Sequence, residues 1–162
     1  MIHTKILTLT TAVSLLTTLT LADISPKNGK WKPKIIDYNT KGCPSMIQST
    51  LKQAKLYSKT KNATFSNPFH PNDLFDPKDL DPNGATDVKW VKIADDTWET
   101  VLKMGQQGMS MDMTWKIKVT SEGSMDMTSK LTMNFPKEMA MMMGGSSECK
   151  IDSSGTIEHI GN

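Results

Sequence analysis

Apolar and polar residues alternate one by one through two neighbouring segments, residues 109–120 and 125–135. The odd-numbered positions of the two segments carry mostly large apolar side chains, namely Met109, Met111, Met113, Trp115, Ile117, Val119, Met125, Met127, Leu131, Met133 and Phe135. Successive side chains of a β-strand point to opposite faces, so this pattern predicts two strands that are each buried on one face only. The segment Ser121-Glu122-Gly123-Ser124 between them predicts a turn. We therefore expect an antiparallel hairpin whose odd-numbered side chains are buried.

The rest of the chain extends this prediction to a mainly β (α+β) domain. Residues 88–160 are expected to form a β-meander, with residues 139–151 and 156–160 supplying its last two strands. Residues 30–38 predict a strand that Pro33 places at an edge of the sheet. Ser45 can cap a helix over residues 45–58, where apolar residues recur at helical spacing. The predicted fold is an antiparallel β-meander or curved sheet with one N-terminal helix.

Residues 66–87 are rich in Pro and Asp, and we expect a long loop there. Part of this loop resembles the start of a calcium-binding loop, because Asp79, Asp81, Asn83 and Asp87 stand at its first, third, fifth and ninth positions, with Gly84 at the sixth. The twelfth position, which should be Glu, is Trp90. A series of solvated Asp-Pro turns is the alternative interpretation.

The first 22 residues have the pattern of a cleavable secretory signal peptide. Lys5 precedes an uncharged apolar and Thr-rich stretch, and Thr20 and Ala22 occupy the −3 and −1 positions before Asp23. The alternative, a membrane anchor, requires a longer and more apolar segment. We therefore expect residues 23–162 to form a single exported domain, periplasmic or secreted, with no stable membrane span after cleavage.

Cys43 and Cys149 are the two cysteines of the chain. Two thiols of a small exported domain usually pair, so we expect a disulfide between them. A metal-ligating or redox-active thiol is the alternative, which no CxxC motif supports.

The charged residues argue against nucleic acid as a partner. Without Lys5, 18 Lys face 17 acidic residues, and the chain contains no Arg, the side chain best suited to phosphates and base edges. The sequence also lacks the common catalytic motifs, such as G-x-S-x-G, H-E-x-x-H and a Gly-rich phosphate loop. An enzyme of unknown class is therefore only the third functional hypothesis.

Eleven of the 13 methionines fall between Met104 and Met143. Three interpretations are open: packing of a curved sheet, binding of an apolar ligand on a Met-lined face, and binding of Cu(I) by thioethers. For copper, the candidate ligands are Met109, Met111, Met113, Met125 and Met127, which could face each other across the hairpin; Met139, Met141, Met142 and Met143 form a further cluster.

Four features occur together: Gly29-Lys30-Trp31 soon after the cleavage site, an early Cys43, the Met-dense hairpin and a terminal Cys149. In this combination the chain resembles a family of small exported bacterial proteins of unknown function, with a G-x-W start, Met-rich strands and a final Cys. The Asp-Pro loop departs from that pattern. The resemblance implies a periplasmic location and carries no activity, ligand or catalytic residue.

The sequence thus predicts a periplasmic binding or interaction protein for an apolar small molecule or a protein partner. A Cu(I)-binding protein is the alternative. We expect no cofactor, with Cu(I) or calcium as the two alternatives.

Overall fold

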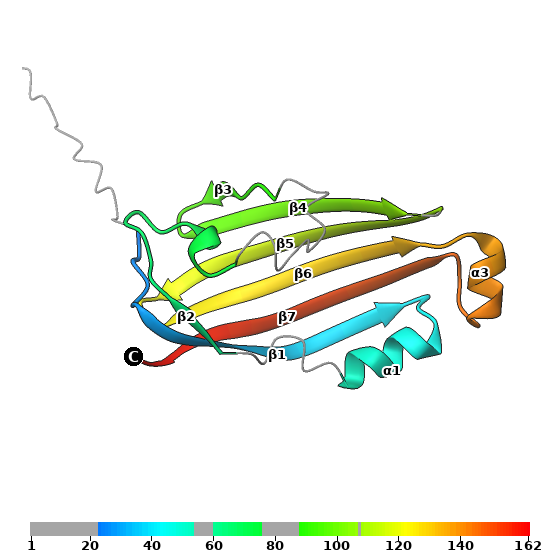
Figure 1. The fold of residues 1–162 in the computed structure, drawn as a ribbon, viewed down its shortest axis with the longest axis horizontal. Helices are drawn as coiled ribbons and strands as arrows, with labels where there is room; N and C mark the ends of the chain where they lie inside the picture. Colours follow the sequence, from blue (N-terminus) through cyan, green and yellow to red (C-terminus); the bar gives the residue numbers. More distant parts are fainter. Residues whose placement is uncertain (1–22, 54–59, 76–87, 107) are drawn as a thin grey trace, which may run out of the picture.

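The computed structural model describes residues 23–53, 60–75, 88–106 and 108–162. Its centre is one curled antiparallel sheet of seven strands in the order β2-β1-β7-β6-β5-β4-β3 (Figure 1). The strands are β1 (Gly29–Lys41), β2 (Lys61–Ala63), β3 (Val91–Ala94), β4 (Thr97–Gln106), β5 (Met109–Ser121), β6 (Ser124–Asn134) and β7 (Glu148–Gly161). Strands β3 to β7 follow one another along the sheet, as predicted for a meander. The prediction of two last strands over residues 139–151 and 156–160 is wrong, because residues 148–161 form one continuous strand, β7. Only β1 and β2, from the N-terminal part, are added beyond β7.

The predicted hairpin is β5 and β6. Their register opposes Met111 to Met133, Met113 to Leu131 and Ile117 to Met127. Odd-numbered side chains lie on one face, which we call the inner face, and Asp112 and Lys116 between them are exposed. Alternation therefore predicted the face of each side chain correctly, because successive residues follow the pleat. The expected burial holds for Trp115, Ile117, Val119, Met125 and Met127, whereas the other odd-numbered side chains are only half-buried.

Pro33 lies in β1, where its register partner is Ile157 of β7. On the other side of β1, β2 pairs only with Gly29, Lys30 and Trp31. Among the described residues, Pro33 therefore has a strand on one side only, as a residue without a backbone N–H requires. Strand β1 runs further than residues 30–38, because its second half continues the ladder with β7 as far as Lys41.

The prediction of a single helix is wrong. Helix α1 (Ser45–Gln53) starts at the predicted Ser45, and residues 54–58 of the predicted helix lie outside the described residues. A second helix, α3 (Lys137–Met142), occupies part of the segment expected to be a strand. The run Lys-Glu-Met-Ala-Met-Met consists of good helix formers without alternation, and Gly144, at a φ of 66°, follows the helix in the left-handed conformation. Both helices lie toward the same end of the sheet (Figure 1).

The first part of the predicted loop is built into the core. Asp73 Oδ2 accepts hydrogen bonds from Ser66 N at 2.9 Å and Ser66 Oγ at 2.7 Å, and a 3₁₀ turn, η1 (Pro71–Asp73), follows. This compact turn directs Phe69, Leu74 and Phe75 into the main cluster of buried side chains. A loop was predicted here from the proline content, and the three apolar side chains were not identified as core residues. Residues 76–87 lie outside the described residues.

The main core lies on the inner face, toward the end of the sheet where Trp31 stands. Its fully buried members include Trp31, Ile117, Val119, Met125 and Ile157. Aromatic rings from the 66–75 segment pack on them: Phe69 meets Trp98 edge-on at 4.8 Å between centroids, and Phe75 lies 4.9 Å from Trp115. Among the described residues, no helix is long and apolar enough to cross a membrane.

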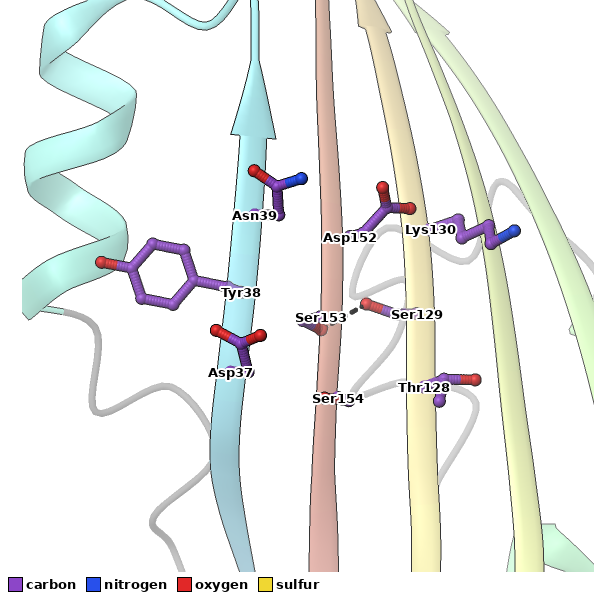
Figure 2. Close-up of a pocket in the computed structure, with 9 residues that line it drawn as sticks. All are labelled: Asp37, Tyr38, Asn39, Thr128, Ser129, Lys130, Asp152, Ser153 and Ser154. Atoms are coloured by element: carbon purple, nitrogen blue, oxygen red, sulfur yellow. Dashed lines mark hydrogen bonds between the residues drawn. The ribbon is translucent and has the colours of Figure 1, made fainter.

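The opposite, outer face is polar. In Figure 2, side chains from β1, β7 and β6 line a shallow depression of about 270 Å³, to which Asp37, Asn39, Lys130 and Asp152 contribute. These residues alternate with the inner-face positions, and Asn39, Asp152 and Lys130 form one cross-strand row. A solvated face of this kind is normal for an antiparallel sheet.

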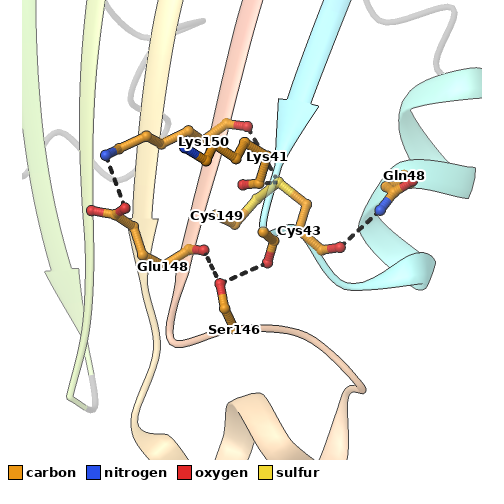
Figure 3. The surroundings of a disulfide bond; sticks show 8 residues. Lys41, Cys43, Gln48, Ser146, Glu148, Cys149 and Lys150 are labelled. Atoms are coloured by element: carbon orange, nitrogen blue, oxygen red, sulfur yellow. Dashed lines mark hydrogen bonds and ion pairs between the residues drawn. A yellow bond between two sulfur atoms is a disulfide. The ribbon is translucent and has the colours of Figure 1, made fainter.

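The predicted disulfide between Cys43 and Cys149 is present, with Cα atoms 4.3 Å apart (Figure 3). Both half-cystines are buried, and they pack with Ile151 in a second, smaller apolar cluster. Gln48 Nε2 of α1 donates to the Cys43 carbonyl at 2.9 Å, and Ser146 Oγ donates to the Gly42 carbonyl at 3.0 Å. The bond therefore joins the start of α1 to the start of β7, at the end of the sheet that carries the helices.

Candidate functional site: a methionine-lined end of the inner face

The inner face changes character along its length. At one end, Ile117, Met125 and Met127 are at most 3% exposed. At the other end, the side chains on the same faces of the same strands are only half-buried. A continuous sheet surface is thus sealed by packing at one end and incompletely covered at the other.

Five methionines occupy the incompletely covered end, and we call them the methionine patch: Met104, Met109, Met111, Met113 and Met133. The backbone register places Met104 of β4 opposite Met111 of β5, and Met111 opposite Met133 of β6. These three residues form one row across three adjacent strands. Two of the five also border the packed clusters, because Met113 packs against the main core and Met133 against the disulfide cluster. Half-buried Leu131 and Phe135 pack against the disulfide cluster as well, together with Ile47 and Leu51 of α1. Helix α1 therefore borders this end of the inner face.

The expected copper ligands are not brought together as a set. Met109, Met111 and Met113 lie in the patch, but Met125 pairs with Val119 and Met127 with Ile117. The hairpin turn fixes this register, and it places Met125 and Met127 in the main core, more than one row of side chains away. Of the further cluster, Met141 and Met142 lie on α3 with 73% and 89% of their surfaces exposed. Sequence reasoning left out Met104 and did not include Met133 among the ligands, although the period-2 pattern of β4 would have found Met104.

Two buried polar atoms lie in or beside the main core. Thr100 pairs with Trp115 across β4 and β5, and the Trp90 ring lies 6.2 Å from the Trp115 ring. Thr100 Oγ1 and Trp90 Nε1 are buried without a hydrogen-bond partner in the described part of the chain. Burying such a group unpaired costs free energy, so a partner that satisfies it is favoured.

Two of the described ion pairs lie on the outer face and at the β3 edge of the sheet. Lys116 pairs with Glu99 at 3.5 Å on the outer face. At the β3 edge, Lys92 Nζ donates a hydrogen bond to Asp23 Oδ2, which raises the pKa of Lys92 above its usual range. The patch itself offers thioether sulfur and hydrocarbon.

The described residues contain no group of three or more His, Cys, Asp or Glu side chains placed to hold a metal ion. The predicted calcium ligands Asp79, Asp81, Asn83 and Asp87 lie outside the described residues. The outer-face depression brings together the carboxylates Asp37 and Asp152 with Lys130, and a hydrogen bond of 2.8 Å joins Ser129 and Ser153 beneath it. At about 270 Å³ it is smaller than ligand-binding clefts usually are.

Comparison of the chain with protein-family models, with curated proteins and with solved structures finds no match.

Proposed function

We propose that this protein is an exported binding protein that holds an apolar ligand against the methionine patch. The observation that carries the proposal is the contrast in burial along one strand face: Met127 is 3% exposed, whereas Met111 and Met133 are half-buried. The part of these side chains that remains accessible favours a partner that removes it from water, at about 25 cal/mol per Å².

Methionine suits this role because its unbranched, polarisable side chain adapts to ligands of different shape. The patch is neutral, which favours a ligand without charge at that end. We further propose that the ligand carries a hydrogen-bond acceptor, which Trp90 Nε1–H and the Thr100 hydroxyl could satisfy. Thr100 and Met104 are four residues apart on β4, about 13 Å along a strand, and fully buried Leu102 lies between them. We therefore propose a long acyl chain with an oxygen-bearing head, which reaches Thr100 by displacing Leu102.

We also propose that the protein acts outside the cytoplasm. A disulfide between distant cysteines is typical of oxidising surroundings, which supports export. A periplasmic location is proposed on the resemblance to small exported bacterial proteins. We propose binding rather than catalysis, since the patch presents no nucleophile, acid or base.

The experiment is a titration of residues 23–162 with the apolar fluorophore N-phenyl-1-naphthylamine. We expect saturable binding to the wild-type chain, displaced by laurate more readily than by dodecylammonium because only laurate carries an acceptor. The substitution Met111→Lys should weaken dye binding by at least about tenfold, because a lysine ammonium is costly to place in an apolar site.

The matched control is Asp112→Lys, which adds the same side chain to the next residue of β5 on the outer face, where Asp112 is exposed. Far-ultraviolet circular dichroism should show both variants folded. Equal weakening by the two substitutions, or wild-type binding that does not saturate, would contradict the proposal. If Met111→Lys does not fold, Met111→Gln replaces it in the same comparison.

A further inference from the structure

We infer that Met104, Met111 and Met133 form a binding site for Cu(I). This inference is independent of the proposed apolar ligand, because it depends on the sulfur atoms and not on the hydrocarbon of the patch. It also differs from the ligand set expected from the sequence, since Met125 and Met127 are sealed in the main core.

The row geometry is suited to one ion. Directly opposed residues of an antiparallel sheet have Cβ atoms about 4.5–5.5 Å apart, so each neighbouring pair in the row Met104–Met111–Met133 starts at that separation. Each methionine side chain is unbranched, and two of its rotatable bonds move the sulfur, which allows the three sulfurs to converge above the middle strand. Met109 and Met113 flank Met111 on the same face at about 6.5–7 Å along β5 and can replace a ligand.

The donor chemistry selects the metal. Neutral thioethers are soft ligands that favour Cu(I), whereas calcium and magnesium require oxygen ligands and zinc prefers nitrogen or thiolate. The next residue in the row, opposite Met133, is Cys149, whose sulfur is bonded to Cys43 and therefore supplies no thiolate. The half-buried state of all three methionines leaves an entry path for the ion.

A thioether site has a further property that distinguishes it from sites made of His or Cys. None of its ligands binds a proton between pH 5 and 8, so metal binding releases none. The affinity for Cu(I) should therefore stay within about twofold across that pH range, whereas an imidazole ligand would weaken binding at the acidic end.

The test is a Cu(I) titration of residues 23–162 against the chromophoric chelator bathocuproine disulfonate, without oxygen. Ascorbate keeps the copper reduced and, unlike a thiol, leaves the disulfide closed. We expect one Cu(I) per chain, and a loss of affinity greater than about tenfold in the triple variant Met104→Leu, Met111→Leu, Met133→Leu. Leucine matches methionine closely in volume, so this variant should fold.

Two control variants have the same chemical change elsewhere: Met125→Leu with Met127→Leu in the main core, and Met141→Leu with Met142→Leu on the exposed α3. Both should bind Cu(I) as the wild type does.

Three outcomes would overturn the inference: the wild-type chain does not compete for Cu(I), the triple variant of the row binds Cu(I) as well as the wild type does, or the α3 variant loses Cu(I) binding. Dye binding and Cu(I) binding are both measured on the wild-type chain. A wild type that binds Cu(I) but not the dye refutes only the proposed function, and a wild type that binds the dye but not Cu(I) refutes only the copper site.

Discussion

Replacing Cys43 and Cys149 with alanine is expected to lower the free energy of unfolding by about 4–5 kcal/mol. The two residues are 106 positions apart, so the bond closes a loop that spans most of the folded domain. A cross-link of this length restricts the unfolded chain strongly, and its removal restores that conformational freedom. Both half-cystines are buried, and alanine avoids leaving a buried hydroxyl in their place. Because single domains are stable by only about 5–15 kcal/mol, the loss is a large part of the total.

Urea unfolding followed by tryptophan fluorescence measures this change. The wild-type chain reduced with tris(2-carboxyethyl)phosphine serves as the control, and its unfolding midpoint should move toward that of the double variant. An unfolding free energy within about 1 kcal/mol of the wild type would mean that the bond does not constrain the unfolded chain as the loop length implies.

The substitution Trp31→Ala is expected to lower the free energy of unfolding by about 3–5 kcal/mol. Trp31 is fully buried, meets Phe65 and His159 edge-on at 5.5 Å from each ring, and donates its indole N–H to the Lys27 carbonyl at 2.9 Å. Alanine would leave a large cavity where β1, β7 and the N-terminal segment meet, and it would leave the carbonyl without this donor.

Trp31→Phe keeps an aromatic ring in the site and should lose clearly less stability than Trp31→Ala. Val91→Ala, at a residue 59% exposed on β3, should change the free energy by no more than about 0.5 kcal/mol. Equilibrium urea unfolding compares the three variants. A Trp31→Ala effect as small as that of Val91→Ala would show that Trp31 is not part of the core.

The parts of the fold that local pattern encodes could be predicted from the sequence. The hairpin β5–β6 follows from alternation, because the position of a residue in a strand decides on which side of the sheet its side chain lies, whatever packs against that side. The start of α1 follows from Ser45 and the helical spacing after it. Helix α3 was not predicted, because a short apolar run suits a strand or a helix, and the choice depends on Pro136 and Gly144 at its ends.

The site was less predictable, since it depends on contacts between segments far apart in the chain. Alternation shows that Met111 and Met127 lie on one face, but only the packing of Phe69, Leu74 and Phe75 seals the end where Met127 stands. Likewise, the row from Met104 to Met133 results from the registers of two strand pairs. These registers are set by turns whose geometry the sequence does not show. The unpaired Trp90 and Thr100 atoms are visible only once the core is assembled.

The central claim is that the methionine patch is an open binding surface, and methionine oxidation measures this residue by residue. Residues 23–162 are treated briefly with hydrogen peroxide, with and without N-phenyl-1-naphthylamine, and sulfoxide formation is quantified by peptide mass spectrometry. In the free protein, we expect Met142 to react fastest, Met111 and Met133 at intermediate rates, and Met125 and Met127 slowest, as their exposures require. Saturating dye should slow oxidation of Met111 and Met133 and leave Met141 and Met142 unchanged. Bound dye that leaves Met111 and Met133 as reactive as before, or that protects Met141 and Met142 equally, would contradict the account.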